Sequence, residues 1–172
     1  MWHWHWIVIT SLLGAGSALA ASPAAAPSPV EIGSFKDWSA YSFGNGRAKV
    51  CYMMSRPKSS TPKLEKRGQA HVMVTHRPAD KALNEVSVTA GYAFKKGSDA
   101  TATVDKSKFD LFTKDDKAWS EKDDAKLVDA FKSGNQLEVR GQPEKGPATV
   151  DVYSLTGFAA AHTAIDKACE VK

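Results

Sequence analysis

The stretch from Asn84 to Gly97, NEVSVTAGYAFKKG, is the clearest indication of how this chain folds. Its apolar residues recur at every second position from Val86 to Phe94, and small or polar residues lie between them. Successive side chains point to opposite faces of a strand, so this pattern predicts a half-buried strand of an antiparallel sheet. A mainly β fold is therefore expected.

Other segments continue this alternation on both sides. The trio Gly44-Asn45-Gly46 separates two of them and predicts a hairpin, because these residues tolerate the backbone of tight turns. In all, about eight strands are predicted, at residues 38–43, 49–55, 70–75, 84–94, 101–104, 109–112, 137–140 and 149–155.

Two stretches follow helical spacing instead. Residues 123–132 begin with two aspartates and end before Gly134, as helix ends favour. Residues 157–168 place Phe158, Ala161 and Ile165 close to one face. Eight strands with one short helix and a C-terminal helix predict an antiparallel β-sandwich.

The first thirty residues contain no Asp, Glu, Lys or Arg. An apolar run, Trp6 to Leu13, is followed by small residues and by Ala18-Leu19-Ala20, a pattern typical of a signal-peptidase site. Residues 1–20 are therefore predicted to be a cleaved signal peptide, which also removes His3 and His5. A retained transmembrane helix is the competing interpretation, but it needs about 20 strongly apolar residues. No membrane anchor is expected after cleavage.

The predicted mature chain begins with a Pro/Ala/Ser-rich spacer, residues 21–30, which is expected to be disordered. Residues 31–172 are predicted to form a single β-sandwich domain. Cys51 and Cys169 are the two cysteines of the sequence. Disulfides persist in the oxidising compartments that exported proteins enter, so we predict a bridge between them.

The net charge of +4 is spread along the chain rather than concentrated on one segment with stacking aromatics, which argues against nucleic-acid binding. The sharpest local asymmetry is residues 56–67, where five basic residues face one glutamate and give a net charge of +4. This segment is expected to be an exposed loop, either merely solvated or attracted to anionic lipid, glycan or an acidic protein face. The candidate partner-binding residues are Arg56, Lys58, Lys63, Lys66 and Arg67.

No group of residues predicts a catalytic, cofactor or metal site. The pairs Asp115-Asp116 and Asp123-Asp124 are adjacent in sequence, so their side chains are expected to diverge rather than converge on one substrate atom. His71 and His76 are five residues apart and fall on opposite faces of a strand. His162 is expected at the edge of the core on the last helix. Residues 153–157, YSLTG, lack the leading glycine of a nucleophile elbow.

Several short runs in a fixed order resemble the invasion-associated locus B family of alphaproteobacterial envelope proteins. The similarity covers about residues 31 to 170. The runs are FKDWSAY (35–41), KVCYMMSRPK (49–58), VTHRP (74–78), NEVSVTAGYAFKKGS (84–98), FDLFTKDDKAW (109–119) and DVYSLTGFAAAHTAIDKAC (151–169).

This resemblance implies a small exported protein, periplasmic or associated with the surface, with a β-sandwich and a Cys51–Cys169 bridge. One branch of the family is linked to host-cell entry, and the family offers no established catalytic residues. We therefore expect a non-enzymatic module that binds an envelope or host macromolecule, anionic if the basic loop makes the contact. Two alternatives stay open: an accessory chaperone or inhibitor of another exported protein, and a hydrolase whose site assembles only in the fold from His76, Arg77 and Glu85.

Overall fold

The computed structural model describes residues 28–171. The predicted signal peptide lies outside the described residues, and so does most of the predicted spacer. The last spacer residue, Val30, is already the first residue of strand β1 (Val30–Phe35). Neither helix among the described residues is long and apolar enough to cross a membrane.

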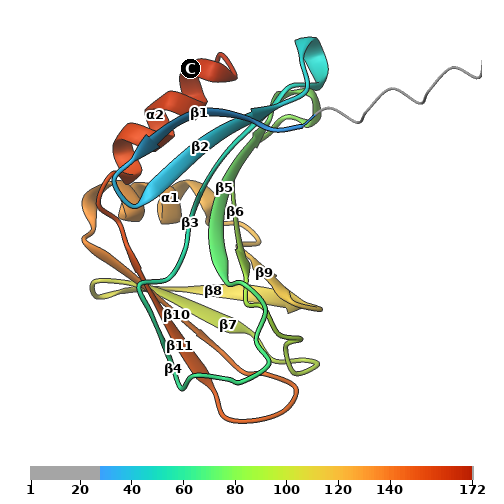
Figure 1. Cartoon of the computed structure of the whole chain (residues 1–172), viewed down its shortest axis with the longest axis vertical. Coiled ribbons are helices and arrows are strands. Elements are labelled where there is room, and N and C mark those ends of the chain that lie inside the picture. Colours follow the sequence, from blue (N-terminus) through green and yellow to red (C-terminus); the bar gives the residue numbers. More distant parts are fainter. Residues whose placement is uncertain (1–27, 172) are drawn as a thin grey trace, which may run out of the picture.

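Eleven antiparallel strands form one strongly curved, open sheet, in the order β1-β2-β3-β5-β6-β9-β8-β7-β10-β11-β4 (Figure 1). The remaining strands are β2 (Trp38–Phe43), β3 (Val50–Ser55), β4 (Ser59–Thr61), β5 (His71–Arg77), β6 (Ala82–Thr89), β7 (Ala100–Val104), β8 (Ser107–Lys114), β9 (Lys117–Trp119), β10 (Gln136–Gly141) and β11 (Thr149–Ser154).

Strand β8 joins the two halves of this sheet. Its first part, Ser107 to Leu111, pairs with β7, and its last part, Phe112 to Lys114, pairs with β9. The sheet can therefore fold over on itself without closing into a barrel, and the two halves enclose the core. The predicted mainly β, sandwich-like architecture is confirmed.

The number of strands is higher than predicted. All eight expected strands are present, but three others were not foreseen: β1, and the short strands β4 and β9. The strand expected over residues 84–94 ends at Thr89. Gly91 follows with a φ of +74°, and a Cβ atom there would lie 2.3 Å from the carbonyl oxygen of Gly68. This close backbone approach turns the chain out of the sheet, although the apolar alternation continues.

Two helices cover one face of the first half of the sheet. Helix α1 (Asp124–Ser133) packs against β6, and helix α2 (Phe158–Ala168) packs against β1, β2 and β3. The bounds match the predicted helices within two residues, and Gly134 follows α1 as expected. Figure 1 shows both helices on the same side of strands β1 to β6.

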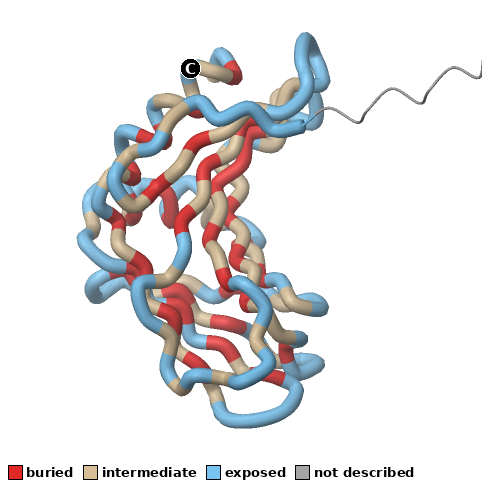
Figure 2. The backbone as a smooth tube through the Cα atoms, in the orientation of Figure 1, coloured by how far each residue is buried: buried red, intermediate tan, exposed pale blue. Residues whose placement is uncertain are grey.

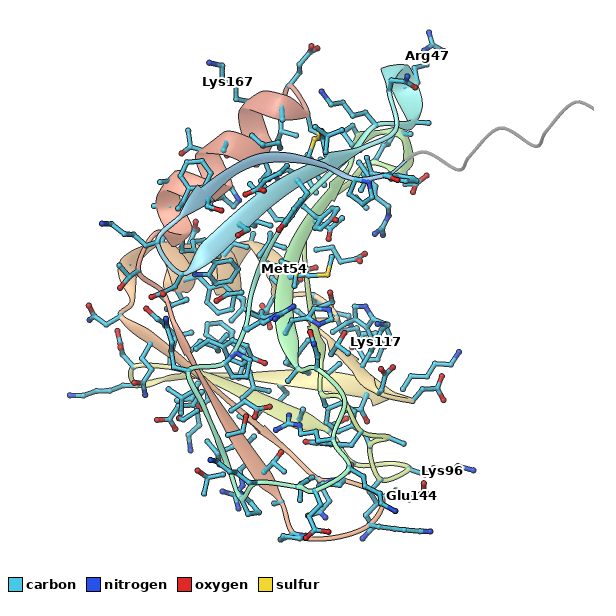
Figure 3. The ribbon with its side chains drawn as sticks, viewed as in Figure 1. Arg47, Met54, Lys96, Lys117, Glu144 and Lys167 are labelled. Atoms are coloured by element: carbon cyan, nitrogen blue, oxygen red, sulfur yellow. A yellow bond between two sulfur atoms is a disulfide. The ribbon has the colours of Figure 1, made fainter. Side chains whose placement is uncertain are left out.

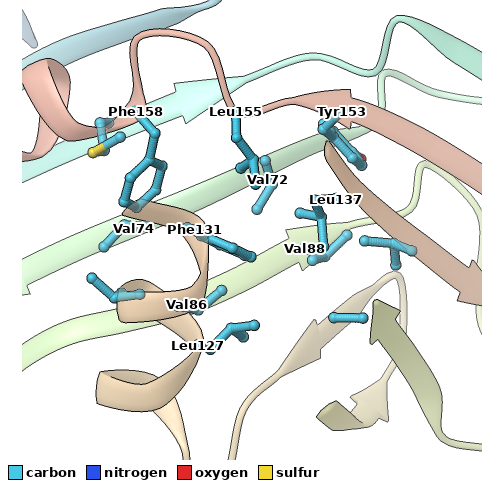
Figure 4. Packing of buried hydrophobic residues seen from close by; sticks show 14 of the residues in the cluster. Val72, Val74, Val86, Val88, Leu127, Phe131, Leu137, Tyr153, Leu155 and Phe158 are labelled. Atoms are coloured by element: carbon cyan, nitrogen blue, oxygen red, sulfur yellow. The ribbon is translucent and has the colours of Figure 1, made fainter. Parts of the chain in front are cut away.

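The core lies between these helices and the two halves of the sheet, where buried residues gather along the strands in Figure 2. In Figure 4, Phe131 and Phe158 of the helices lie over valines of β5 and β6, and Leu137 and Tyr153 lie further along the same core. The predicted bridge is confirmed, because Cys51 and Cys169 form a disulfide with a Cα–Cα distance of 5.9 Å. It ties the end of α2 to β3.

Candidate functional site: the outer sheet face

The face of β2, β3, β5, β6 and β9 that points away from the helices carries large side chains. Alternation along β3 explains this: Cys51 and Met53 are buried on the helix side, whereas Tyr52 and Met54 point outward and are half-buried. Figure 3 shows Met54 and Lys117 on the side away from the helices. We call this surface the outer face; its central residues are Ser39, Tyr41, Tyr52, Met54, Met73, Ser87, Phe112 and Trp119.

Strand register aligns these side chains in two rows across the sheet. One row runs from Ser39 through Met54, Met73, Ser87 and Trp119 to Phe112. In the other, Tyr41 lies opposite Tyr52, and their rings stack at 5.2 Å between centroids with an interplanar angle of 22°.

Phe112 and Trp119 stack similarly, at 5.3 Å and 21°. Residues opposite each other on antiparallel strands lie close enough for such pairs to form. The result is a continuous surface rich in aromatic and methionine side chains, two types that are enriched in protein interfaces.

The basic segment 56–67 is not the uniform exposed loop that was expected. Its residues Ser59–Thr61 form strand β4, which pairs with β11 at the edge of the sheet. Arg67 is buried: its guanidinium donates to both carboxylate oxygens of Asp151, at 2.7 and 2.5 Å, and its Nε donates to the carbonyl of Ala90. The side chain of Arg67 is therefore directed into the protein and paired there, unlike the exposed position that the sequence suggested.

The other basic residues of the segment lie in three places. Lys63 and Lys66 are exposed beyond β4. Lys58 forms an ion pair with Asp37 of the β1–β2 turn. Arg56 is exposed next to the outer face, directly after β3. The charge available to a partner is thus smaller than the sequence suggests and is divided between the two ends of the segment.

A buried cluster under α2 was not foreseen. His162 and Asp166 lie one turn apart on α2, and His76 of β5 approaches them from the sheet. His76 Nε2 is 2.8 Å from one Asp166 oxygen, and His162 Nδ1 is 2.9 Å from the other. An irregularity in the pairing of β5 with β6 places Asn84, at a φ of +60°, between the two rings. Its backbone N–H donates to His76 Nδ1, and its amide oxygen lies 2.7 Å from His162 Nε2.

These hydrogen bonds decide what the cluster can do. Ligand-type atoms of His76, His162 and Asp166 lie within 4.8 Å of one another, a grouping that could suggest a metal site. However, the Asn84 N–H occupies the lone pair of His76 Nδ1, so the neutral ring carries its proton on Nε2 and donates it to Asp166. Nε2 then has no lone pair for a metal ion. Both rings are also buried, so neither can reach a substrate. The cluster instead fastens α2 to the sheet.

Comparison with known proteins now identifies the family. The family model for the invasion-associated locus B (IalB) protein matches residues 38–166, about three quarters of the chain. The chain belongs to the invasion-associated locus B family. The crystal structure of the invasion-associated protein B from Bartonella henselae has a similar fold, with a TM-score of 0.58 and 16% identity over 82% of this chain and 99% of that one. No match was found among individually curated proteins.

The hydrolase alternative is not supported in this IalB-family chain, because its three residues do not converge. Arg77 makes a two-point ion pair with Glu85, at 3.0 and 2.6 Å. His76 precedes Arg77 on β5, points to the opposite face and bonds to Asp166. Two other candidates from the sequence also have structural partners. Asp124, of the second acidic pair, accepts a hydrogen bond from the backbone N–H of Val86, and Ser154, of the YSLTG segment, accepts one from the backbone N–H of Thr156. These ion pairs and hydrogen bonds stabilise the local fold.

Sequence reasoning missed the cluster and the outer face for different reasons. His76 and His162 are far apart in sequence, and only the packing of α2 on β5 joins them. The outer face had a visible signal: Tyr52 and Met54 share the face opposite the buried Cys51. A strand with large side chains on both faces predicts either burial on both sides or an unusual exposed surface.

The histidine cluster predicts that stability falls in mild acid. Burial lowers the pKa of His76 and of His162 below the ordinary value of 6.5, and Asp166 opposes this shift for both rings. Lys132 of α1 acts in the same direction as burial. The unfolded chain therefore binds more protons than the folded chain just below pH 6.5, so the free energy of unfolding decreases as pH falls through this window.

Urea denaturation at steps from about pH 7 to about pH 5 measures this effect, which is at most about 1.4 kcal/mol per pH unit for each histidine. His162→Gln keeps a polar side chain without the titration and should make the profile less steep, while His76 continues to titrate. An equally steep profile in that variant would contradict the assignment to His162.

Proposed function

We propose that this protein is an exported, non-enzymatic binding module of the cell envelope that contacts a protein partner through its outer face. Membership of the invasion-associated locus B family and the Cys51–Cys169 disulfide support export. The lack of convergence among His76, Arg77 and Glu85 supports a binding role rather than hydrolysis. The proposed location is the periplasm or the outer surface, and the proposed role is either in the envelope itself or in host-cell entry.

The outer face is the observation that carries this proposal. Helices α1 and α2 cover the other side of the same strands, whereas no element among residues 28–171 packs over Met54 and Met73. Sheet faces left open to water usually carry short polar side chains. This face instead presents stacked aromatic pairs and two methionines, which supply contact area and adapt to a partner.

The experiment is site-specific photo-crosslinking in the producing cells. A photoreactive residue at Met73, in the middle of the outer face, is expected to give a crosslinked product of defined size in the envelope fraction. The same residue at Asp105, in the exposed β7–β8 turn, is the matched control. Equal products at both positions would count against the outer face. Association with several different client proteins would favour the chaperone alternative.

A charge placed on this face should abolish binding without unfolding the protein. Met54→Asp puts a carboxylate into the row beside Met73 and is expected to reduce the Met73 crosslink by at least about tenfold, because desolvating a charged group in an apolar interface is costly. Val30→Asp changes another exposed apolar side chain, on edge strand β1, which is not among the strands of the outer face, and should leave the crosslink unchanged. An intact crosslink in Met54→Asp would refute the proposed contact surface.

A further inference from the structure

A hollow opens at the end of the outer face where β1 turns into β2. Its volume is about 420 Å³, and it is formed by the β1–β2 turn, by β2 and β3, and by the first residues after β3. Tyr41 and Met54 line it from the sheet, and Lys36, Asp37, Arg56 and Lys58 line it from the chain segments at its rim. This volume is within the range of sites that hold one small group.

The hollow carries uncompensated positive charge. Three of its lining residues are basic and one is acidic, and the acidic residue, Asp37, is already paired with Lys58. That ion pair and two further bonds, from Ser55 Oγ to the Asp37 carbonyl and from the Asp37 N–H to the Thr156 carbonyl, fix the turn next to the hollow. Among the described residues, neither Lys36 nor Arg56 takes part in an ion pair.

We infer that this hollow receives an aspartate or glutamate side chain of the protein partner; the inference rests on the proposed function of the outer face. A guanidinium such as that of Arg56 binds a carboxylate through two parallel hydrogen bonds, and Lys36 adds a second positive charge. Tyr41 and Met54 contact the apolar part of the same side chain. The hollow then specifies an acidic residue beside the apolar surface of the partner.

The arrangement favours a protein over an acidic polysaccharide because the hollow is continuous with the outer face. Met54 and Tyr41 belong to both, so a ligand seated in the hollow also meets the row of aromatic and methionine side chains. Arginine at the edge of an aromatic and methionine surface is a combination enriched in protein interfaces.

The test is an NMR titration of the mature, disulfide-bonded chain with short blocked peptides. The peptide Leu-Glu-Leu is expected to shift the amide signals of Tyr41, Met54 and Arg56, and Leu-Gln-Leu is expected to leave them unchanged. Arg56→Gln should weaken binding of the glutamate peptide at least about tenfold, since it removes the charge-assisted hydrogen bonds to the carboxylate. Lys145→Gln, an exposed lysine of the β10–β11 connection, is the charge-matched control.

Two outcomes would overturn the inference. One is equal binding of the glutamate and glutamine peptides, and the other is saturation of the hollow by oligogalacturonate with no response to the glutamate peptide. The crosslink at Met73 distinguishes this failure from failure of the proposed function. If that crosslink persists while the hollow shows no preference for the carboxylate, the outer face binds a protein and the inference about its charge is wrong.

Discussion

Removing the disulfide is expected to lower the free energy of unfolding by up to about 4–5 kcal/mol, because the bridge closes a long loop in the unfolded chain. The two cysteines are 118 residues apart, so the bridge constrains most of the described chain. Single domains are stable by only about 5–15 kcal/mol, so the reduced protein would lose a large fraction of its stability. A fall in melting temperature of roughly 10–15 °C is expected for a domain of this size.

The cleanest comparison uses one polypeptide in its oxidised and reduced forms, because no side-chain atoms are then removed. Cys51→Ala with Cys169→Ala adds the effect of a small cavity, since Cys51 is fully buried. Urea denaturation of both forms, with free thiols quantified, gives the difference directly. A difference below about 1 kcal/mol would show that the end of α2 stays docked on β3 through its other contacts and that the loop constraint contributes little.

The spacing of apolar residues along the sequence was enough to predict most of the fold. Alternation identified eight strands, and helical spacing with aspartates before it and Gly134 after it located α1. Of the three missed strands, β4 and β9 have only three residues each, and β1 pairs with a single neighbour at the edge of the sheet. Their existence depends on the neighbouring strand rather than on their own composition. The same holds for the end of β6, which is set by the distant backbone of Gly68.

The candidate site was harder to predict because charge was judged by sequence proximity. Residues 56–67 looked like one basic loop, yet their side chains go to three different places. Arg67 is buried with Asp151, Lys58 pairs with Asp37, and Arg56 faces the hollow. Each destination depends on a residue from elsewhere in the chain, so composition alone could not assign it.

The buried ion pair between Arg67 and Asp151 provides the second large expected effect. Their side chains are only 8% and 3% exposed, and they join the end of the basic segment to β11. Arg67 also donates to the Ala90 carbonyl and lies 5.0 Å from the centre of the Tyr92 ring. The hydrogen-bonding groups of Arg67 are thus largely satisfied inside the protein, which is the condition under which a buried charge is tolerated.

Arg67→Ala should lower the free energy of unfolding by about 3–5 kcal/mol, because it leaves the Asp151 carboxylate buried without its partner. Replacing both partners with apolar side chains, Arg67→Met with Asp151→Leu, should recover much of this loss, since no isolated charge remains. Urea denaturation of the wild type, Arg67→Met, Asp151→Leu and the double variant yields the coupling energy between the pair.

The pair Arg77–Glu85 is the matched control, because it has the same two-point geometry on the surface. Its side chains are 35% and 30% exposed, so water screens the charge that remains after one partner is removed. Arg77→Ala should therefore cost only about 0–1 kcal/mol. Equal losses for Arg67→Ala and Arg77→Ala would mean that Asp151 gains access to water in the variant. If the Arg67→Ala loss is as large as expected, reduced binding by that variant would reflect unfolding, and only Arg56, Lys63 and Lys66 would remain suitable for testing contacts of the basic segment.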